Sequence, residues 1–250
     1  MAVFIIAEFG SCHDGDYLNV DSLIRYAKNA GADAAKIQFW SDSKRLAERR
    51  HMTDWTGYER YRVPYAWLPR MEETCRRIGI EMMATVYLPE DVALVDPYVR
   101  RHKVASFEAG DAELLGLLER TGKPVYVSRG MTDTEQVAEG PFRYLHCVSG
   151  YPTPRHEANI RRVQHYDGYS DHTTSEISGA LAVAMGATII EKHLRLLRTP
   201  ETNPDYPHSL TQAGFTAYVK NIIDAEQLLG TGEAVIQPSE AENARYKVVS

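Results

Sequence analysis

Two histidines end two short apolar segments in the second half of the chain. His172 closes the phrase Gly-Tyr-Ser-Asp-His, and His193 closes the phrase Ile-Glu-Lys-His. Because side chains alternate along a strand, Ser170 would share a face with His172, and Glu191 with His193. Imidazoles beside carboxylates suit a divalent ion that keeps open positions for water or substrate. We predict a metal site at His172 and His193, with hydrogen-bonded core histidines as the alternative.

Two lysines lie within other strand-like segments. Lys36 interrupts the phrase Ala-Ala-Lys-Ile-Gln-Phe-Trp, and Lys103 follows a histidine in a similar setting. A buried ammonium group needs anionic partners, so two such lysines beside hydroxyl groups predict a site for a phosphate or a carboxylate. An exposed position at a strand end is the alternative. The polar residues expected at this end of the strands are Glu8, Lys36, Gln38, Thr85, Lys103, Ser106, Glu108, Ser128, Ser149, Tyr151, Ser170 and Glu191.

Strand-like segments alternate with helical patterns along the whole chain. The predicted strands cover 3–10, 34–40, 81–88, 102–108, 124–128, 144–149, 168–172 and 188–194. The predicted helices cover 21–30, 65–78, 90–99, 112–121, 134–139, 160–165, 176–185 and 212–229. This alternation favours the α/β class and a (β/α)8 TIM barrel, whose catalytic groups come from the carboxyl ends of its strands. A doubly wound sheet is the alternative, but no Gly-x-Gly-x-x-Gly follows the first strand.

The pattern also predicts the domain organisation. Residues 1–230 form one catalytic barrel, and residues 231–250, which have no periodicity, form a C-terminal tail or linker. The connection at 41–63 is longer than usual and rich in aromatic residues, which favours a lid, a binding loop or a dimer contact. The basic residues at 44–50 are interpreted as a solvated face.

Composition limits the classes of partner. The 250 residues carry a formal net charge of −6, which gives no reason to expect nucleic acid. No apolar segment reaches the roughly 18 residues of a membrane span, and the first residues do not form a signal peptide, so we expect a cytoplasmic protein without a membrane partner. Three cysteines without a Cys-x-x-Cys pair predict reduced thiols.

Several short phrases follow one another in a distinctive order. They are Ala-Glu-Phe-Gly at 7–10, His-Asp-Gly-Asp at 13–16, Lys-Ile-Gln at 36–38, Ser-Arg-Gly-Met at 128–131, His-Cys-Val-Ser-Gly-Tyr-Pro-Thr-Pro at 146–154, Gly-Tyr-Ser-Asp-His-Thr at 168–173 and Glu-Lys-His at 191–193. In this order the chain resembles the N-acetylneuraminate (sialic acid) synthase family. The last four phrases together are highly specific, whereas any one alone is a weak signal.

The resemblance implies a (β/α)8 enzyme that condenses phosphoenolpyruvate with an open-chain aldose, an amino sugar or a sugar phosphate. The products would be phosphate and a 2-keto-3-deoxy sugar acid. It implies a divalent ion, Mn²⁺ with Mg²⁺ or Co²⁺ as alternatives, at His172 and His193, and a homodimer. Glu108, Glu8 and Lys103 would be the catalytic groups. The substrate-binding residues would be Lys36, Gln38, Thr85, Ser106, Ser128, Ser149, Tyr151, Ser170 and Asp205.

The chain departs from the family pattern at several places. Cys12, Arg129 and Ser149 replace the usual residues, and the phrase after the last strand reads Asn-Pro-Asp-Tyr. The family's C-terminal antifreeze-like domain, which delivers an arginine to the sugar pocket of the partner subunit, is expected to be missing. We predict that Arg198 or Arg129 takes over this contact, since a guanidinium can bind a carboxylate or phosphate bidentately. A separate capping protein is a further expectation, and the acceptor sugar stays open.

Two other functions remain open from the sequence. A metal-dependent aldolase or isomerase could use the same barrel, because a fold does not determine its chemistry. A non-catalytic sugar-binding or phosphate-binding protein is the third possibility. The retention of both lysines, both histidines and Glu108 argues against this third function.

Overall fold

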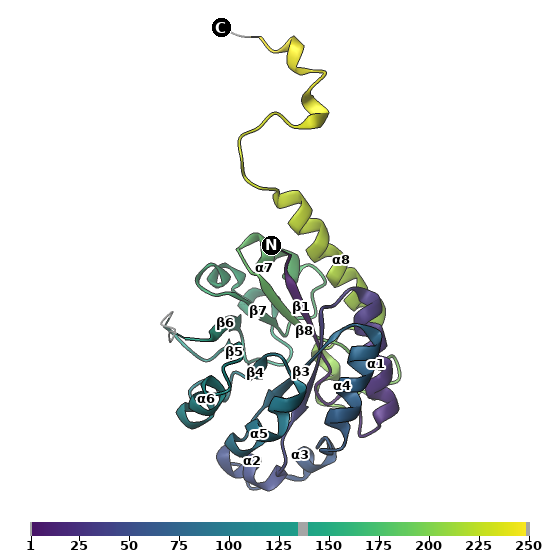
Figure 1. Ribbon diagram of the computed structural model, residues 1–250, viewed down its shortest axis with the longest axis vertical. Helices are drawn as coiled ribbons and strands as arrows, with labels where there is room; N and C mark the ends of the chain where they lie inside the picture. Colours follow the sequence, from purple (N-terminus) through teal and green to yellow (C-terminus); the bar gives the residue numbers. More distant parts are fainter. Residues whose placement is uncertain (1, 135–139, 249–250) are drawn as a thin grey trace.

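A computed structural model describes residues 2–134 and 140–248. In this part of the chain eight parallel strands pair in sequence order, and the last strand pairs with the first to close a barrel (Figure 1). The strands are β1 (Phe4–Glu8), β2 (Ala34–Phe39), β3 (Glu81–Val86), β4 (His102–Val104), β5 (Val125–Arg129), β6 (Phe142–Cys147), β7 (Gly168–Asp171) and β8 (Ile189–His193). The predicted (β/α)8 TIM barrel is confirmed.

Helices surround the barrel, and several differ from their predicted lengths. They are α1 (Tyr17–Ala30), α2 (Ser43–Arg49), α3 (Thr56–Arg60), α4 (Trp67–Ile78), α5 (Val92–Val95), α6 (Ala112–Glu119), α7 (Ser178–Ala184) and α8 (Gln212–Leu229). Helix α1 begins earlier than predicted because the Asp16 side chain caps it by accepting a hydrogen bond from the Leu18 amide. The segment 160–165 forms a 3₁₀ helix in place of an α-helix. The helix predicted at 134–139 lies almost entirely outside the described residues.

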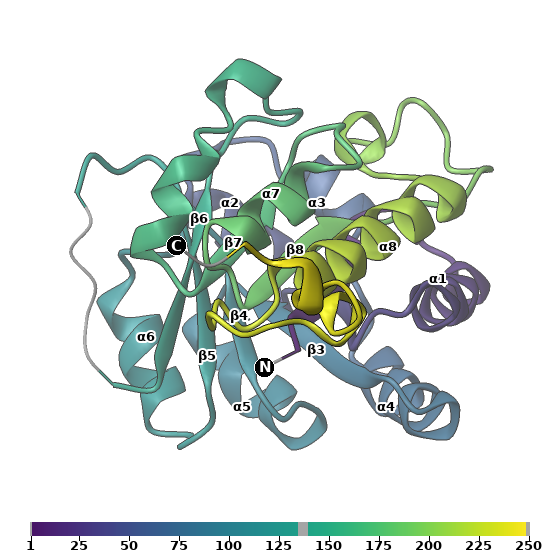
Figure 2. The same cartoon turned by 90° about the horizontal axis from the view of Figure 1, so that it is seen from above.

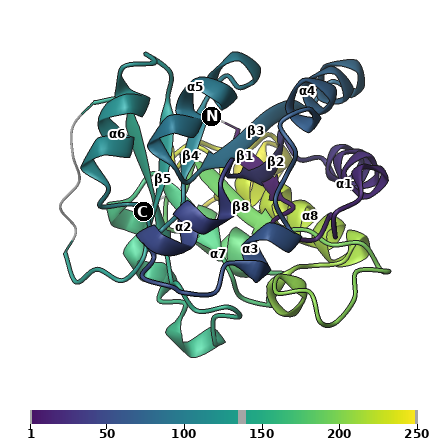
Figure 3. The same ribbon diagram turned by 90° about the horizontal axis from the view of Figure 1, so that it is seen from below.

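The connection between β2 and α4 is more ordered than the sequence predicts. It contains α2, which the Asp42 side chain caps, and the short helix α3. Figure 3 looks at this end of the barrel and shows α2 and α3 in front of the carboxyl ends of the strands. The connection is therefore a helical cover at the barrel mouth.

The barrel interior changes from apolar to polar along the strands. Ile6 in the middle of β1 and Ile189 at the start of β8 face inward, and two residues later on each strand Glu8 and Glu191 face inward. The apolar interior cluster consists of Ile6, Ala34, Met83, Tyr126, Leu145 and Ile189. This cluster supports a layer of polar side chains at the carboxyl ends of the strands.

Outside the barrel, a buried ion pair fastens the last two strands to the last two helices. The Lys192 ammonium lies 3.1 Å from Asp171 Oδ2, and both side chains are fully buried. The same carboxylate accepts hydrogen bonds from Ser178 Oγ at 2.5 Å and Tyr218 Oη at 2.9 Å. Asp171 and Lys192 thus face away from the interior that their neighbours line, as strand alternation requires.

The last residues lie apart from the barrel. Residues 231–243 and 245–248 are exposed and run away from α8, as Figure 1 shows, and in the view from above they lie in front of the barrel (Figure 2). Among the described helices, none combines the length and the apolar character that a membrane span needs. Cys12, Cys75 and Cys147 are buried and free, in agreement with the prediction of unpaired thiols.

Helix α7 packs closely on α8 at Gly179, which yields a matched pair of substitutions. An added Cβ at Gly179 would lie 2.6 Å from the Tyr218 ring, whereas one at Gly116 in α6 would meet only the end of Arg120, at 3.7 Å. We expect Gly179→Ala to lower the free energy of unfolding by about 1–3 kcal/mol through overpacking. Gly116→Ala should raise it by about 0.5–1 kcal/mol through helix propensity. Urea denaturation measures both, and equal effects would contradict this packing.

Candidate active site

A cavity of about 310 Å³ opens at the carboxyl ends of the strands. Most of the residues predicted from the sequence line it. They are Glu8, Lys36, Gln38, Thr85, Lys103, Ser106, Ser128, Tyr151, Ser170, His172, His193 and Asp205. The barrel therefore brings the predicted metal site and the predicted anion site into one cavity.

The floor of the cavity is a cluster of buried opposite charges. The Lys36 ammonium forms an ion pair with Glu8 and lies 3.4 Å from Glu191 Oε2. The Lys103 ammonium lies 3.6 Å from Glu191 Oε1. Each of these side chains is at most 5% exposed. Glu191 thus bridges the two lysines, and Glu8 adds a second counterion.

These pairings set the charge states of the floor. Burial raises the pKa of Glu191, but Lys103 and Lys36 outweigh it and lower the pKa to about 2. Burial lowers the pKa of Lys36, and the two neighbouring carboxylates overcome this effect and raise it. At the other two groups burial outweighs the neighbouring charges, so the pKa of Lys103 is lowered and the pKa of Glu8 is raised. The floor therefore stabilises the charged forms of Lys36 and Glu191 most strongly.

Hydroxyl groups complete the anion site. Lys36 Nζ donates to Thr85 Oγ1 at 2.6 Å, and Lys103 Nζ donates to Ser128 Oγ at 2.7 Å. Ser149 does not line the cavity, but its hydroxyl donates to Ser106 Oγ, which does, at 2.7 Å. The lysines and hydroxyls could accept a phosphate or a carboxylate together.

The two predicted metal-binding histidines face the same space. Their ring centroids lie 5.4 Å apart. His172 Nδ1 lies 3.1 Å from the Val148 carbonyl oxygen, a contact that fixes the ring and leaves Nε2 for a ligand. Burial lowers the pKa of His172 to about 4 and that of His193 well below its usual value. Both imidazoles are therefore neutral at pH 7, which is the form that binds metals.

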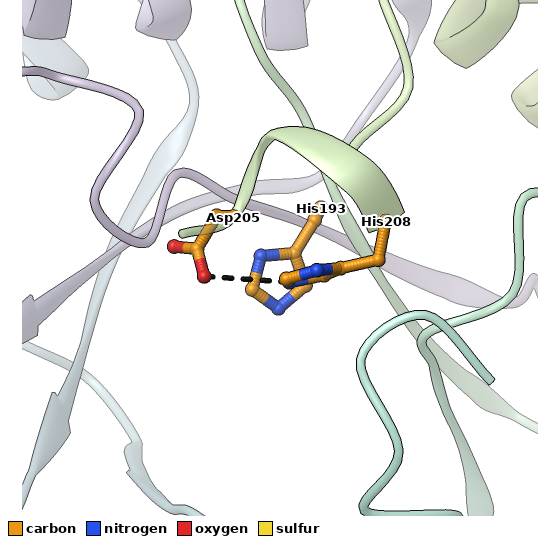
Figure 4. Close-up of side chains that lie close together, drawn as sticks. All are labelled: His193, Asp205 and His208. Atoms are coloured by element: carbon orange, nitrogen blue, oxygen red, sulfur yellow. Dashed lines mark ion pairs between the residues drawn. The ribbon is translucent and has the colours of Figure 1, made fainter. Parts of the chain in front are cut away.

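A third histidine, which the sequence interpretation missed, joins them. Potential ligand atoms of His193, Asp205 and His208 all lie within 4.8 Å of one another (Figure 4). His193 Nδ1 and both nitrogens of His208 are buried and have no hydrogen-bond partner among the described residues. Such a set of nitrogen and carboxylate donors fits a divalent ion. One feature of the sequence could have indicated His208: it lies in the loop after the last strand, and such loops meet at the mouth of the barrel.

The loop that carries Asp205 is fixed to the first strand's loop. Asp205 Oδ2 accepts a hydrogen bond from the Ser11 amide, and the Asn203 side chain bonds both the hydroxyl and the carbonyl of Ser11. Gly10 allows this approach, because a Cβ there would lie 1.7 Å from the Asp205 carboxylate. Residues almost 200 positions apart thus build one wall of the cavity.

The interpretation of the basic segment at 44–50 as a solvated face is wrong for Arg50. Its side chain is 21% exposed and lines the cavity. Its Nε and Nη2 donate to Glu108 Oε1 at 2.9 and 2.6 Å, and the guanidinium carbon lies about 5 Å from the Tyr87 and Phe107 ring centroids. Glu108 itself lies outside the cavity lining, behind Arg50, where burial raises its pKa and Arg50 opposes that effect.

Neither arginine proposed for the sugar contact lines the cavity. Arg129 follows the inward-facing Ser128 on β5, so it points outward, and its guanidinium carbon lies 5.8 Å from the Tyr144 ring centroid. Arg198 donates from Nε and Nη2 to Asn19 Oδ1. The guanidinium in the cavity wall belongs instead to Arg50, which α2 positions at its carboxyl end.

A second cavity of about 410 Å³ adjoins the first. It shares Gln38, Pro204 and Asp205 with the main cavity. Its other walls come largely from the helical cover, and they are Ser11, Trp40, Met52, Asp54, Gly57, Tyr58 and Tyr61. The helical cover therefore adds an aromatic chamber beside the polar site.

Comparison with known proteins places the chain in a family. The model of the NeuB family matches residues 23–234. The chain belongs to the NeuB family. The family resemblance predicted from the short phrases is thereby confirmed.

Three related proteins show how far the similarity of this NeuB-family chain extends. The pseudaminic acid synthase of Campylobacter jejuni is 31% identical, over 96% of this chain and 79% of that protein. The N,N'-diacetyllegionaminic acid synthase of Legionella pneumophila is 30% identical, over 97% and 77%. The crystal structure of an N-acetylneuraminic acid (sialic acid) synthetase from Leptospira borgpetersenii, in complex with citrate, superposes with a TM-score of 0.89 at 28% identity, covering 98% and 91%. The family is thus one of sugar acid synthases.

The bridging role of Glu191 predicts a large effect of its removal. Glu191→Gln would leave two buried ammonium groups without their shared counterion, so we expect the free energy of unfolding to fall by about 3–5 kcal/mol. Inorganic phosphate should restore part of the melting temperature by binding the lysines. The exposed Glu201 supplies the control, and Glu201→Gln should have no effect. A Glu191→Gln variant as stable as the wild type would contradict the charge cluster.

The buried neutral histidines predict a loss of stability in mild acid. Burial lowers the pKa of His13 and of His172 from 6.5 to about 4, so the folded protein favours their neutral forms. The free energy of unfolding is therefore highest above about pH 6.5, and it decreases as the pH falls toward 4. Between pH 7 and pH 5 the metal-free protein should lose about 2 kcal/mol for each of the two groups. Urea denaturation at both pH values measures the loss of free energy of unfolding. His13→Asn should remove the part of this loss that comes from His13.

Proposed function

We propose that this protein condenses phosphoenolpyruvate with the open-chain form of an aldose, an amino sugar or a sugar phosphate. The products are phosphate and a 2-keto-3-deoxy sugar acid. The observation that carries the proposal is the meeting, in one cavity, of two buried lysines with hydroxyl groups and of three imidazoles with a carboxylate. The names of the related synthases, which make pseudaminic, diacetyllegionaminic and N-acetylneuraminic acids, support the same chemistry.

Phosphoenolpyruvate binds over the charged floor in this proposal. Lys36 and Lys103 face its phosphate and carboxylate, and the floor hydroxyls donate hydrogen bonds to the same oxygens. Arg50 adds a third positive charge at the wall. Glu8 and Glu191 keep the lysines in place when no substrate is present, so the site is preorganised for an anion.

The reaction forms one carbon–carbon bond and breaks one carbon–oxygen bond. C3 of phosphoenolpyruvate attacks the aldehyde carbon of the sugar, water adds to C2, and the bond from C2 to the phosphate oxygen then breaks. A divalent ion, Mn²⁺ with Mg²⁺ or Co²⁺ as alternatives, would polarise the aldehyde carbonyl when bound near the imidazoles. Glu8 lies in the cavity wall, and Glu108 lies behind Arg50, so both carboxylates stay candidates for orienting the water.

The acceptor sugar occupies the aromatic chamber in this proposal. Gln38 and Asp205 belong to both cavities and would bind hydroxyl groups at the junction. Trp40, Tyr58 and Tyr61 offer apolar ring faces, which suit the methyl group of an N-acetyl substituent. We therefore favour an acetamido sugar as acceptor. The homodimer and the separate capping protein stay predictions.

The test is a phosphate-release assay with phosphoenolpyruvate, Mn²⁺ and a panel of aldoses, acetamido sugars and sugar phosphates, with product masses measured. We expect phosphate release that depends on one sugar class and yields the mass of a 2-keto-3-deoxy acid. Lys103→Met should reduce kcat/KM by at least 100-fold, which corresponds to about 2.7 kcal/mol.

Lys44, whose side chain is 68% exposed outside the cavity, provides the matched control, and Lys44→Met should retain activity. Phosphate release that does not depend on an added sugar would contradict the proposal. Cleavage or isomerisation of a sugar without phosphoenolpyruvate would favour an aldolase or isomerase instead.

A further inference from the structure

We propose that His208 is a metal ligand, so that three imidazoles and the Asp205 carboxylate hold one divalent ion. The sequence points only to His172 and His193, each at the end of a strand. His208 comes from the loop after β8, in the 3₁₀ turn Tyr206–His208. The inference refines the metal site of the proposed function, but it concerns binding alone and can be tested without turnover.

The three rings are arranged as around a common centre. Their centroids are 4.5 Å apart for His193 and His208, 5.4 Å for His172 and His193, and 6.0 Å for His172 and His208. A metal–nitrogen bond of about 2.1 Å puts an imidazole centroid about 3.3 Å from the ion. Two such rings at right-angled or tetrahedral positions are therefore separated by roughly 4.5–5.5 Å. Two of the three separations lie in this range, and the third exceeds it slightly.

The polar atoms of His208 are otherwise unused. The residue is 1% exposed, and neither ring nitrogen has a hydrogen-bond partner among the described residues. Its Nε2 lies 3.3 Å from Asp205 Oδ1, which is a charge contact only if the ring is protonated. A buried polar atom left without a partner costs about 1–3 kcal/mol, and metal binding would remove that cost.

The backbone holds His208 firmly at this place. The Leu210 amide donates to the His193 carbonyl at 2.9 Å, which joins the loop to the end of β8. The Ser209 hydroxyl donates to the Asp205 carbonyl at 2.6 Å and closes the turn. Asp205 and His208 are thus three residues apart on a fixed turn. The backbone carbonyl of His193, a third proposed ligand, is hydrogen-bonded to the same segment.

The alternative is a structural role, in which His208 only supports Asp205 through a hydrogen bond. The two roles differ in the number of imidazole nitrogens that bind the ion, which is three if His208 is a ligand and two at most if it is a support. Three imidazole nitrogens favour Mn²⁺, Co²⁺ or Zn²⁺ over Mg²⁺, which prefers oxygen ligands. With His208 as a support only, the ion would be left with at most the two imidazoles of His172 and His193 and the Asp205 carboxylate.

The experiment compares metal binding by the metal-free wild type, His208→Ala and His208→Gln. Electron paramagnetic resonance of free Mn²⁺ gives the Kd, and electron spin-echo modulation of bound Mn²⁺ reports the coupled imidazole nitrogens. We expect both variants to bind Mn²⁺ about 100-fold more weakly and to lose the modulation of one nitrogen. In the wild type, Mn²⁺ should raise the melting temperature at concentrations where Mg²⁺ does not.

His156 supplies the matched control, because its side chain is 82% exposed and does not line the cavity. His156→Ala should keep the wild-type Kd and nitrogen signal. Unchanged Mn²⁺ affinity and an unchanged nitrogen count in a folded His208 variant would overturn the inference. If both variants fail to fold, the wild-type spectrum decides: three coupled imidazoles support the inference, and two or fewer overturn it. None of these outcomes depends on whether phosphoenolpyruvate is the substrate.

Discussion

The structure depends on a buried balance of charge inside a closed barrel. Lys36 on β2 and Lys103 on β4 both lie close to Glu191, and Glu8 forms a second ion pair with Lys36. Each charge alone would be very costly at this depth, but the cluster is nearly neutral and holds every side chain in one place. The barrel therefore holds Lys36 and Lys103 where the anionic substrate of the proposed function would enter, and these lysines lower the pKa of Glu191, which stays ionised beside them.

This constraint explains how the rest of the interior is organised. An apolar layer around Ile6 and Ile189 closes the barrel below the charges and keeps water from reaching them from that side. On the outside, the Asp171–Lys192 pair uses the opposite faces of β7 and β8 to hold α7 and α8. The alternating direction of strand side chains thus separates two ionic networks, one for the site and one for the fold.

The loops at the mouth convert this charged floor into a site with two compartments. The turn with Asp205 and His208 brings donors over the floor from one side, and α2 brings Arg50 from the other. The aromatic chamber shares Gln38 and Asp205 with the main cavity, so two substrates could meet at that junction. Catalytic variety in this fold generally arises in such loops, because the strands supply a rigid base.

The sequence by itself determined those side-chain positions that depend on the alternation of residues along a strand. The positions of Lys36, Lys103 and the two strand-end histidines in one cavity follow from the period of two along strands and from the closure of eight strands. Asp205 was assigned by resemblance to a family whose membership is now established.

Only the tertiary structure decided which loop residues join these strand residues in the cavity. Arg50 lies in a basic segment whose composition suggests a solvated face, yet it turns inward because Glu108, from a distant loop, binds it. His208 reaches the cavity because Asp205 is bonded to Ser11, almost 200 residues earlier in the chain. Arg129 and Arg198 are excluded from the lining for the same kind of reason, since one points outward from its strand and the other is bound by Asn19. Such contacts join segments that have no local periodicity in common, so no pattern within either segment records them.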